Sequence, residues 1–155
     1  MTDEGLRHLA RQTGLRDLDL GHCGRLSPAG LRSALQALPD VRVLSLAGCG
    51  AVGDSVLRAA VSGMARLSRL DLSGCCAVTD SGLGSLQTCW MLRRLSISRC
   101  REVSQQCLAA IEEHLPNLVS VVAECCYAKP IRCGQTEEDW ESDHGEAWPP
   151  SLPLP

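Results

Sequence analysis

The chain has 155 residues, enough for one domain, and contains 24 leucines but no phenylalanine. Its formal charge of −3 is uneven, because 13 Arg face 12 Asp or Glu in residues 1–126, whereas residues 127–155 hold two basic residues and six carboxylates. The near-neutral body has few aromatic residues and no apolar run of the ~18 residues that cross a bilayer, so we expect neither nucleic acid nor membrane as a partner.

The first predicted element is a helix at the amino terminus. The segment Thr2-Asp3-Glu4-Gly5-Leu6 matches Thr79-Asp80-Ser81-Gly82-Leu83, and its threonine and aspartate suit a helix start. An acidic beginning of this kind does not resemble a secretory signal. We therefore expect a cytoplasmic or nuclear location.

The second predicted element is a short strand, which opens a pattern that recurs to residue 126. The phrase Leu15-x-x-Leu18-x-Leu20-x-x-Cys23 returns four times, and its cysteines are 26, 26, 25 and 26 residues apart. This phrase and period are the leucine-rich-repeat signature, with one strand and one helix in each turn of a solenoid. We predict an α/β leucine-rich-repeat solenoid of four to five repeats over residues 1–126, with parallel strands on the concave face and helices on the convex face.

A helix should follow the cysteine in each later repeat. Residues that suit a helix cap or a first turn stand at every expected start, namely Ser27-Pro28, Gly53-Asp54, Thr79-Asp80 and Ser104-Gln105. Apolar residues then follow at helical spacing, as in Leu31, Ala34, Leu35 and Leu38. These apolar faces should pack behind the strands.

Because the first helix matches the helix of a later repeat, the chain enters partway through a repeat. We expect it to be the carboxyl-terminal portion, or an isoform, of a longer protein. The terminal repeats of a solenoid usually need a polar cover. We therefore also predict marginal stability and self-association through the first repeat.

Residues 127–155 form an acidic, Pro-rich segment in which the repeat pattern is lost. We expect this tail to be disordered, because its composition supports neither a helix nor a central strand. A solvated tail is the simplest interpretation. The alternative is that Trp140 and Trp148 dock on a partner or fold back over the last repeat.

The repeated cysteines are expected to be reduced, buried and structural: Cys23, Cys49, Cys75, Cys100 and Cys126. Neighbouring strands are close enough for disulfides, but parallel side chains and a reducing compartment argue against them. A free cysteine packs as a small apolar residue whose S–H can reach a carbonyl. No C-x-x-C pair occurs, so we expect no metal, and no motif implies a cofactor.

Residues that flank the buried strand positions should point to the concave face, because side chains alternate along a strand. They vary between repeats, as a binding face allows, and the predicted partner-binding residues are Asp17, Asp19, Arg69, Asp71, Arg94, Ser96, Arg99 and Arg101. The four arginines should form one positive cluster near Asp71, suited to an acidic or phosphorylated protein segment through bidentate contacts. The alternative is an ordinary solvated surface with charge pairs between repeats.

Catalysis is not expected. His22 and Cys23 are adjacent, yet neighbouring residues at a strand end point to opposite faces, so the imidazole should face outward while the thiol is buried. A catalytic thiol needs an accessible position beside its base. The sequence also lacks a phosphate-binding glycine loop and a serine nucleophile elbow.

The copies spanning residues 15–31 and 67–83 resemble the cysteine-containing leucine-rich repeats of F-box and leucine-rich-repeat proteins and of antagonist-of-mitotic-exit proteins. In F-box members, an F-box binds the Skp1 adaptor of a cullin ubiquitin ligase while the repeats hold the substrate. The resemblance covers residues 2–126 and implies the substrate-binding part of an SCF ubiquitin-ligase receptor. This chain contains no F-box, so Skp1 and cullin are expected only if an F-box lies upstream or in another isoform. The alternative is a scaffold or inhibitor that binds one protein without any ligase.

Overall fold

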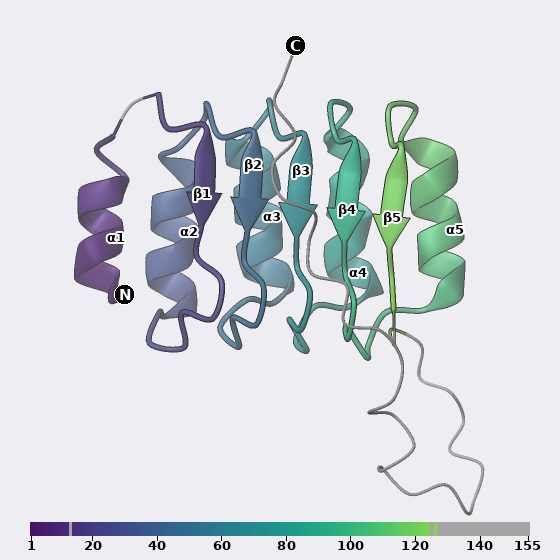
Figure 1. Ribbon diagram of the computed structural model, residues 1–155, viewed down its shortest axis with the longest axis horizontal. Helices are drawn as coiled ribbons and strands as arrows, with labels where there is room; N and C mark the ends of the chain where they lie inside the picture. Colours follow the sequence, from purple (N-terminus) through teal and green to yellow (C-terminus); the bar gives the residue numbers. More distant parts are fainter. Residues whose placement is uncertain (13, 125, 127–155) are drawn as a thin grey trace, which may run out of the picture.

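The computed structural model describes residues 1–12, 14–124 and 126. Five short strands form one parallel sheet in the order β1-β2-β3-β4-β5, and the helices lie behind it (Figure 1). The strands are β1 (Asp17–Asp19), β2 (Val43–Ser45), β3 (Arg69–Asp71), β4 (Arg94–Ser96) and β5 (Ser120–Val122). The helices are α1 (Asp3–Leu9), α2 (Pro28–Gln36), α3 (Asp54–Gly63), α4 (Asp80–Leu83), the 3-10 helix η1 (Gly84–Thr88) and α5 (Gln105–His114). This arrangement confirms the predicted solenoid, whereas the predicted tail lies outside the described residues.

The strands pair in the register that the repeat predicts. The middle residue of each strand faces its equivalent in the next, as in Leu44 and Leu70 or Leu70 and Leu95. These leucines are at most 1% exposed, and the helices α2, α3 and α5 bury their apolar faces against them. None of the helices within the described residues is long and apolar enough to cross a membrane.

Four of the five repeated cysteines form a buried column, each donating its S–H to a carbonyl of the preceding repeat. Cys49 Sγ lies 2.9 Å from Leu20 O, and equivalent bonds join Cys75 to Leu46, Cys100 to Leu72 and Cys126 to Ile97. The structure thus places these four thiols in the core, where each contacts the preceding repeat. Cys23 departs from the prediction because it is only half-buried: it belongs to the first strand, so no earlier strand lies beside it.

At three junctions an aspartate at the first helical position ties one repeat to the next. The N–H and O–H of Ser27 donate to the Asp3 carboxylate at 2.9 and 2.5 Å. Thr79 bonds Asp54 in the same way, and Ser104 bonds Asp80. Each of these hydroxyls also caps its own helix by accepting a backbone N–H. We call this arrangement the aspartate clamp.

One junction lacks the clamp. At the equivalent positions α2 starts with Pro28, which has no carboxylate, and α3 is preceded by Gly53, which has no hydroxyl. At two of the clamped junctions a third position is glycine, and a Cβ on Gly30 or Gly82 would collide with the clamping carboxylate of Asp3 or Asp54. At the Asp80–Ser104 clamp the same position is Cys107, which donates its N–H to the Ser104 hydroxyl. Val56 occupies that position at the unclamped junction.

The fourth repeat has a short α-helix followed by a 3-10 helix. Its helical segment is one residue shorter, since nine residues separate Asp80 from Cys89 whereas ten separate Asp54 from Met64. A 3-10 helix rises about 2.0 Å per residue and an α-helix about 1.5 Å. Converting the second half to η1 therefore lets fewer residues span the same height and keeps Cys89 buried, as Met64 is in the third repeat.

Candidate binding face

The concave face consists of the outward-pointing residues of the five strands. The first position of each strand carries Asp17, Val43, Arg69, Arg94 and Ser120 in turn, and the third carries Asp19, Ser45, Asp71, Ser96 and Val122. Most of these side chains are exposed or half-exposed. Ser96 is the exception at 5% exposed, and its hydroxyl shares a hydrogen bond of 2.7 Å with the Ser73 hydroxyl.

The structure separates the arginines that the sequence placed in one cluster. Arg69 and Arg94 are register partners at the amino ends of β3 and β4. Arg99 and Arg101 lie in the loop after β4, and at about 3.3 Å per residue Arg99 is about 16 Å further along the strand direction. The positive charge therefore forms two sites at opposite rims of the sheet.

The carboxylates of the third strand position are turned away from the amino ends of the strands. Asp71 Oδ1 accepts the N–H of Ser73 at 2.9 Å, and Asp19 Oδ1 accepts the N–H of Gly21 at 2.8 Å. Both residues thus bond backbone that lies two residues further along the chain. Among the described residues, Arg66 and Asp40 form the only salt bridge, at 3.2 Å, so Arg69 and Arg94 have no carboxylate partner.

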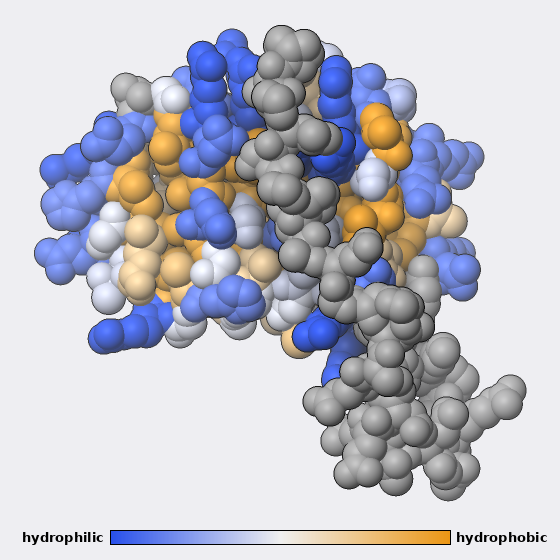
Figure 2. All heavy atoms as spheres, in the orientation of Figure 1, coloured by the Kyte–Doolittle hydropathy of each residue, from blue (hydrophilic) through white to orange (hydrophobic). Residues whose placement is uncertain are grey.

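A row of arginines at the starts of the strands was missed by the sequence reasoning. The residues just before the strands are Arg16, Arg42, Ser68, Arg93 and Val119. Backbone hydrogen bonds connect them in sequence: Arg16 O accepts from Arg42 N, and Ser68 O accepts from Arg93 N. Hydrophilic residues accordingly gather along the rim where the strands begin (Figure 2). The same alignment column was visible in the sequence, one residue ahead of the concave positions.

The turn after each strand contains residues with a left-handed backbone. Gly48 and Gly74 have φ of 66° and 74°, and the equivalent His22 and Arg99 have 57° and 63°. A left-handed conformation is uncommon for residues other than glycine. The His22 ring lies against Gly48, so close that a Cβ on this glycine would collide with Nδ1.

The buried thiols are poorly suited to nucleophilic chemistry. Burial raises the pKa of Cys75 to about 12 and that of Cys100 to about 11, so both remain neutral near pH 7. Burial likewise raises the pKa of Cys89 to about 11. Within the described residues, no cluster of His, Cys, Asp or Glu is arranged to hold a metal ion.

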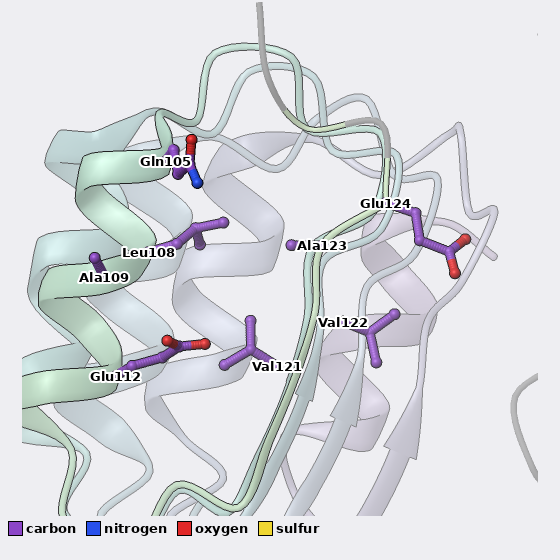
Figure 3. A pocket seen from close by; sticks show the side chains of 8 residues that line it. All are labelled: Gln105, Leu108, Ala109, Glu112, Val121, Val122, Ala123 and Glu124. Atoms are coloured by element: carbon purple, nitrogen blue, oxygen red, sulfur yellow. The ribbon is translucent and has the colours of Figure 1, made fainter.

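A separate hollow of about 470 Å³ lies between α5 and β5, the last helix and the last strand of the described residues. Leu108, Val121 and Ala123 point into it, whereas Val122 and Glu124 point away toward the concave side (Figure 3). Within the described residues, α5 and β5 are the last helix and strand, so the hollow lies on the side of the core that no described element covers.

Comparison with known proteins agrees with this fold. A family model described as Leucine Rich repeat matches residues 67–86, which run from just before β3 to the middle of η1. No curated protein matches the chain.

Several solved structures share the fold at low sequence identity. A chain from the yeast Rad7 and Elc1 complex superposes with a TM-score of 0.65 and 19% identity, covering 88% of this chain and 44% of its own length. The present chain thus spans less than half of that relative. A chain from the Chaetomium Mex67:Mtr2 subunits superposes with a TM-score of 0.57 and 17% identity, covering 81% of this chain and 91% of its own length. The Mex67 leucine-rich-repeat domain from Chaetomium thermophilum gives 0.56, with 19% identity and coverage of 83% and 95%.

Proposed function

We propose that the chain is a protein-recognition module that binds another polypeptide on its concave face. The observation that carries this proposal is the contrast between the two sides of the strands. The inward residues repeat from strand to strand, whereas the concave residues differ in charge, size and hydrogen-bonding capacity. Similar folds also come from structures of a Rad7 and Elc1 complex and of Mex67:Mtr2 subunits.

We further propose that the module is the substrate-binding part of an F-box-like SCF ubiquitin-ligase receptor. The support is the resemblance of residues 2–126 to the cysteine-containing repeats of F-box proteins. The repeats would hold the substrate, while Skp1 and cullin would be recruited by an F-box outside these repeats. Its action would then be ubiquitin-dependent degradation of the bound protein in the cytoplasm or nucleus.

The first test blocks the concave face without disturbing the core. Ser45→Arg combined with Ala47→Arg adds two large charged side chains at half-exposed concave positions in and just after β2. Ser33→Arg combined with Ser55→Arg adds the same groups to exposed positions on α2 and α3. We expect the concave double variant to lose at least tenfold in copurified partner, measured by quantitative mass spectrometry, and the helical control to retain it. Equal recovery with both variants would refute recognition by this face.

The second test separates a ligase receptor from a scaffold or inhibitor. The half-life of the captured partner is measured with and without depletion of the protein. A receptor predicts that depletion lengthens the half-life and that Skp1 and cullin copurify with the receptor protein that carries the F-box. A stoichiometric partner with an unchanged half-life and no Skp1 would support the non-ligase alternative.

A further inference from the structure

We propose that the amino ends of β2–β4 form a binding site for a phosphoryl group on an extended segment of the partner protein. This inference rests on the proposed use of the concave face and adds the chemistry of its ligand. The site is centred on Arg69 and Arg94 and bordered by Arg42 and Arg93. We call these four residues the arginine site.

The backbone brings the four residues together. Arg69 and Arg94 are register partners, and parallel strands lie about 4.8 Å apart. Arg42 O accepts the N–H of Arg69 at 2.9 Å, which places Arg42 beside Arg69. Ser68 O accepts the N–H groups of both Arg93 and Arg94, which places these two beside the preceding strand. The backbone thus brings four arginines to the amino ends of three adjacent strands.

No carboxylate within the described residues pairs with the arginine site. Like charges directly opposite each other on neighbouring strands are unfavourable, and none of the four arginines forms a salt bridge within the described residues. The nearest carboxylate on the same strand, that of Asp71, is held by the N–H of Ser73. An anion between Arg69 and Arg94 would relieve the repulsion that the register creates.

A phosphoryl group fits the site better than a carboxylate. It carries about −1.5 to −2 charges near pH 7 and three acceptor oxygens, enough to bond two guanidinium forks at once. Arg69 and Arg94 are half-exposed and Arg42 and Arg93 are exposed, so the groups are accessible. The guanidinium ion also binds phosphate in a bidentate manner that lysine cannot reproduce.

A nucleic acid fits less well. The arginine site spans only three strands, about 10 Å. Asp17 on β1 bounds it on one side, and Asp71, two residues further along β3 than Arg69, bounds it along the strand direction. A nucleic-acid strand needs a longer positive groove with several aromatic platforms. Trp90 is the single aromatic residue in the described part of the chain.

The acidic β1 edge predicts a second feature of the ligand. Asp17 and Asp19 are exposed and lie two strands from Arg69 and three from Arg94, roughly 12 Å from the centre of the arginine site. An extended peptide covers that distance in about four residues. A segment that crosses the strands should therefore carry a basic residue about four positions from its phosphorylated residue.

The test is an NMR titration of the full chain with three nonapeptides. The first has a central phosphoserine and a lysine at each end, separated by alanine and glycine. The second lacks the phosphate, and the third carries glutamate at both ends. We expect amide shifts at Arg42, Arg69, Arg93 and Arg94 with the first peptide, affinity at least tenfold weaker for the second, and intermediate affinity for the third.

Variants identify the residues responsible. Arg69→Gln combined with Arg94→Gln should weaken binding of the first peptide at least tenfold, because charge-assisted bonds are lost. Arg32→Gln combined with Arg58→Gln removes the same charge from exposed positions on α2 and α3 and should leave the affinity unchanged. Asp71→Asn retains an acceptor for Ser73 and should tighten binding severalfold.

Three results would overturn the inference: equal binding of the phosphorylated and unphosphorylated peptides, unchanged binding by the Arg69 and Arg94 double variant, or tighter binding of a single-stranded oligonucleotide at the same residues. Failure here is distinguishable from failure of the proposed function. If the peptides do not bind but the concave block still abolishes partner capture, recognition by the concave face stands and the phosphoryl site falls. If the phosphopeptide binds at the arginine site but the concave double variant captures the partner as well as the unmodified protein does, the phosphoryl site stands and partner recognition by the concave face falls.

Discussion

On the buried side of the sheet, Leu44, Leu70 and Leu95 repeat one another at the same height and are at most 1% exposed. On the concave side, the first positions of the five strands differ in charge and size: Asp17, Val43, Arg69, Arg94 and Ser120. The buried side must match its neighbours because stacked repeats share one core. The residues on the concave side do not pack into that core, so their identity can vary without loss of the fold. Stability and recognition should therefore be separable by mutation.

The largest expected effect comes from a cavity at the centre of the core. Leu70→Ala removes a side chain that is 0% exposed and has a neighbouring strand on each side, and it should lower the free energy of unfolding by about 2–5 kcal/mol. Arg69→Ala, one residue away on the concave face, should change it by less than about 0.5 kcal/mol. Urea denaturation followed by circular dichroism measures both. Similar losses for the two variants would contradict the separation.

The next effect tests the room that glycine leaves for the aspartate clamp. Gly82→Ala would place a methyl group against the Asp54 carboxylate and should destabilise the protein by about 1–3 kcal/mol. Gly84→Ala meets no atom within 4 Å and has helical backbone angles, so it should stabilise by about 0.5–1 kcal/mol. Thermal unfolding compares the pair. A stabilising Gly82→Ala would show that the clamp does not constrain the junction.

A smaller effect distinguishes buried from exposed thiols. Cys75→Ala should cost about 1–2 kcal/mol, because it leaves the volume of a fully buried sulfur unfilled and removes one of the two donors to the Leu46 carbonyl, the other being the N–H of Cys49. Cys76→Ala, at an exposed position, should be nearly neutral. The pKa of Cys75 is raised by burial from 9.0 to about 12. Above pH 9 the unfolded thiol ionises while the folded one stays protonated, so stability falls as the pH rises toward 12.

That pH dependence provides the control. Cys75→Ala removes the titrating group, so its stability should decline less steeply between pH 9 and 12 than that of the unmodified protein. The measurement is urea denaturation at a series of alkaline pH values. Parallel curves for the two proteins would show that the thiol is not buried in solution.

The smallest effect concerns the first aspartate clamp. Hydrogen bonds from the Ser27 side chain and backbone lower the pKa of Asp3 below its ordinary value of 3.8. The stabilisation is therefore present above pH 3.8 and is lost as the pH falls through the lowered pKa. Asp3→Ala should remove this pH-dependent contribution to the free energy of unfolding. Urea denaturation at a series of pH values between 2 and 5 measures it. Glu4→Ala, an exposed neighbour in the same helix, is the matched control.

The repeat pattern was sufficient to predict most of the fold. It predicted the strands around Leu18 and Leu44, the helix starts at Pro28, Asp54 and Gln105, and the buried cysteine column beyond Cys23. These features depend on the spacing of apolar and capping residues along the chain. Each repeat stacks on the last in the same way, so one local pattern implies the long-range register.

The candidate site was predicted less completely. Alignment of the repeats identified Arg69 and Arg94 as neighbours, but the prediction grouped them with Arg99, five residues after Arg94. The hydrogen bond from Arg99 N to Glu124 O shows that the chain beyond β4 still runs beside the next strand, which separates Arg99 from Arg94 by about 16 Å. The row of Arg16, Arg42 and Arg93 was visible as a column, yet its exposure became evident only in the structure.

The amino-acid sequence alone thus established the period, the core positions and the direction in which each strand side chain points, because these follow from local spacing. The folded chain was needed to show the aspartate clamps, the 3-10 segment that compensates for a missing residue, and the half-exposed Cys23. The physical reason is the same in each case. These features depend on distances between atoms of different repeats, and such distances arise only when the repeats are stacked.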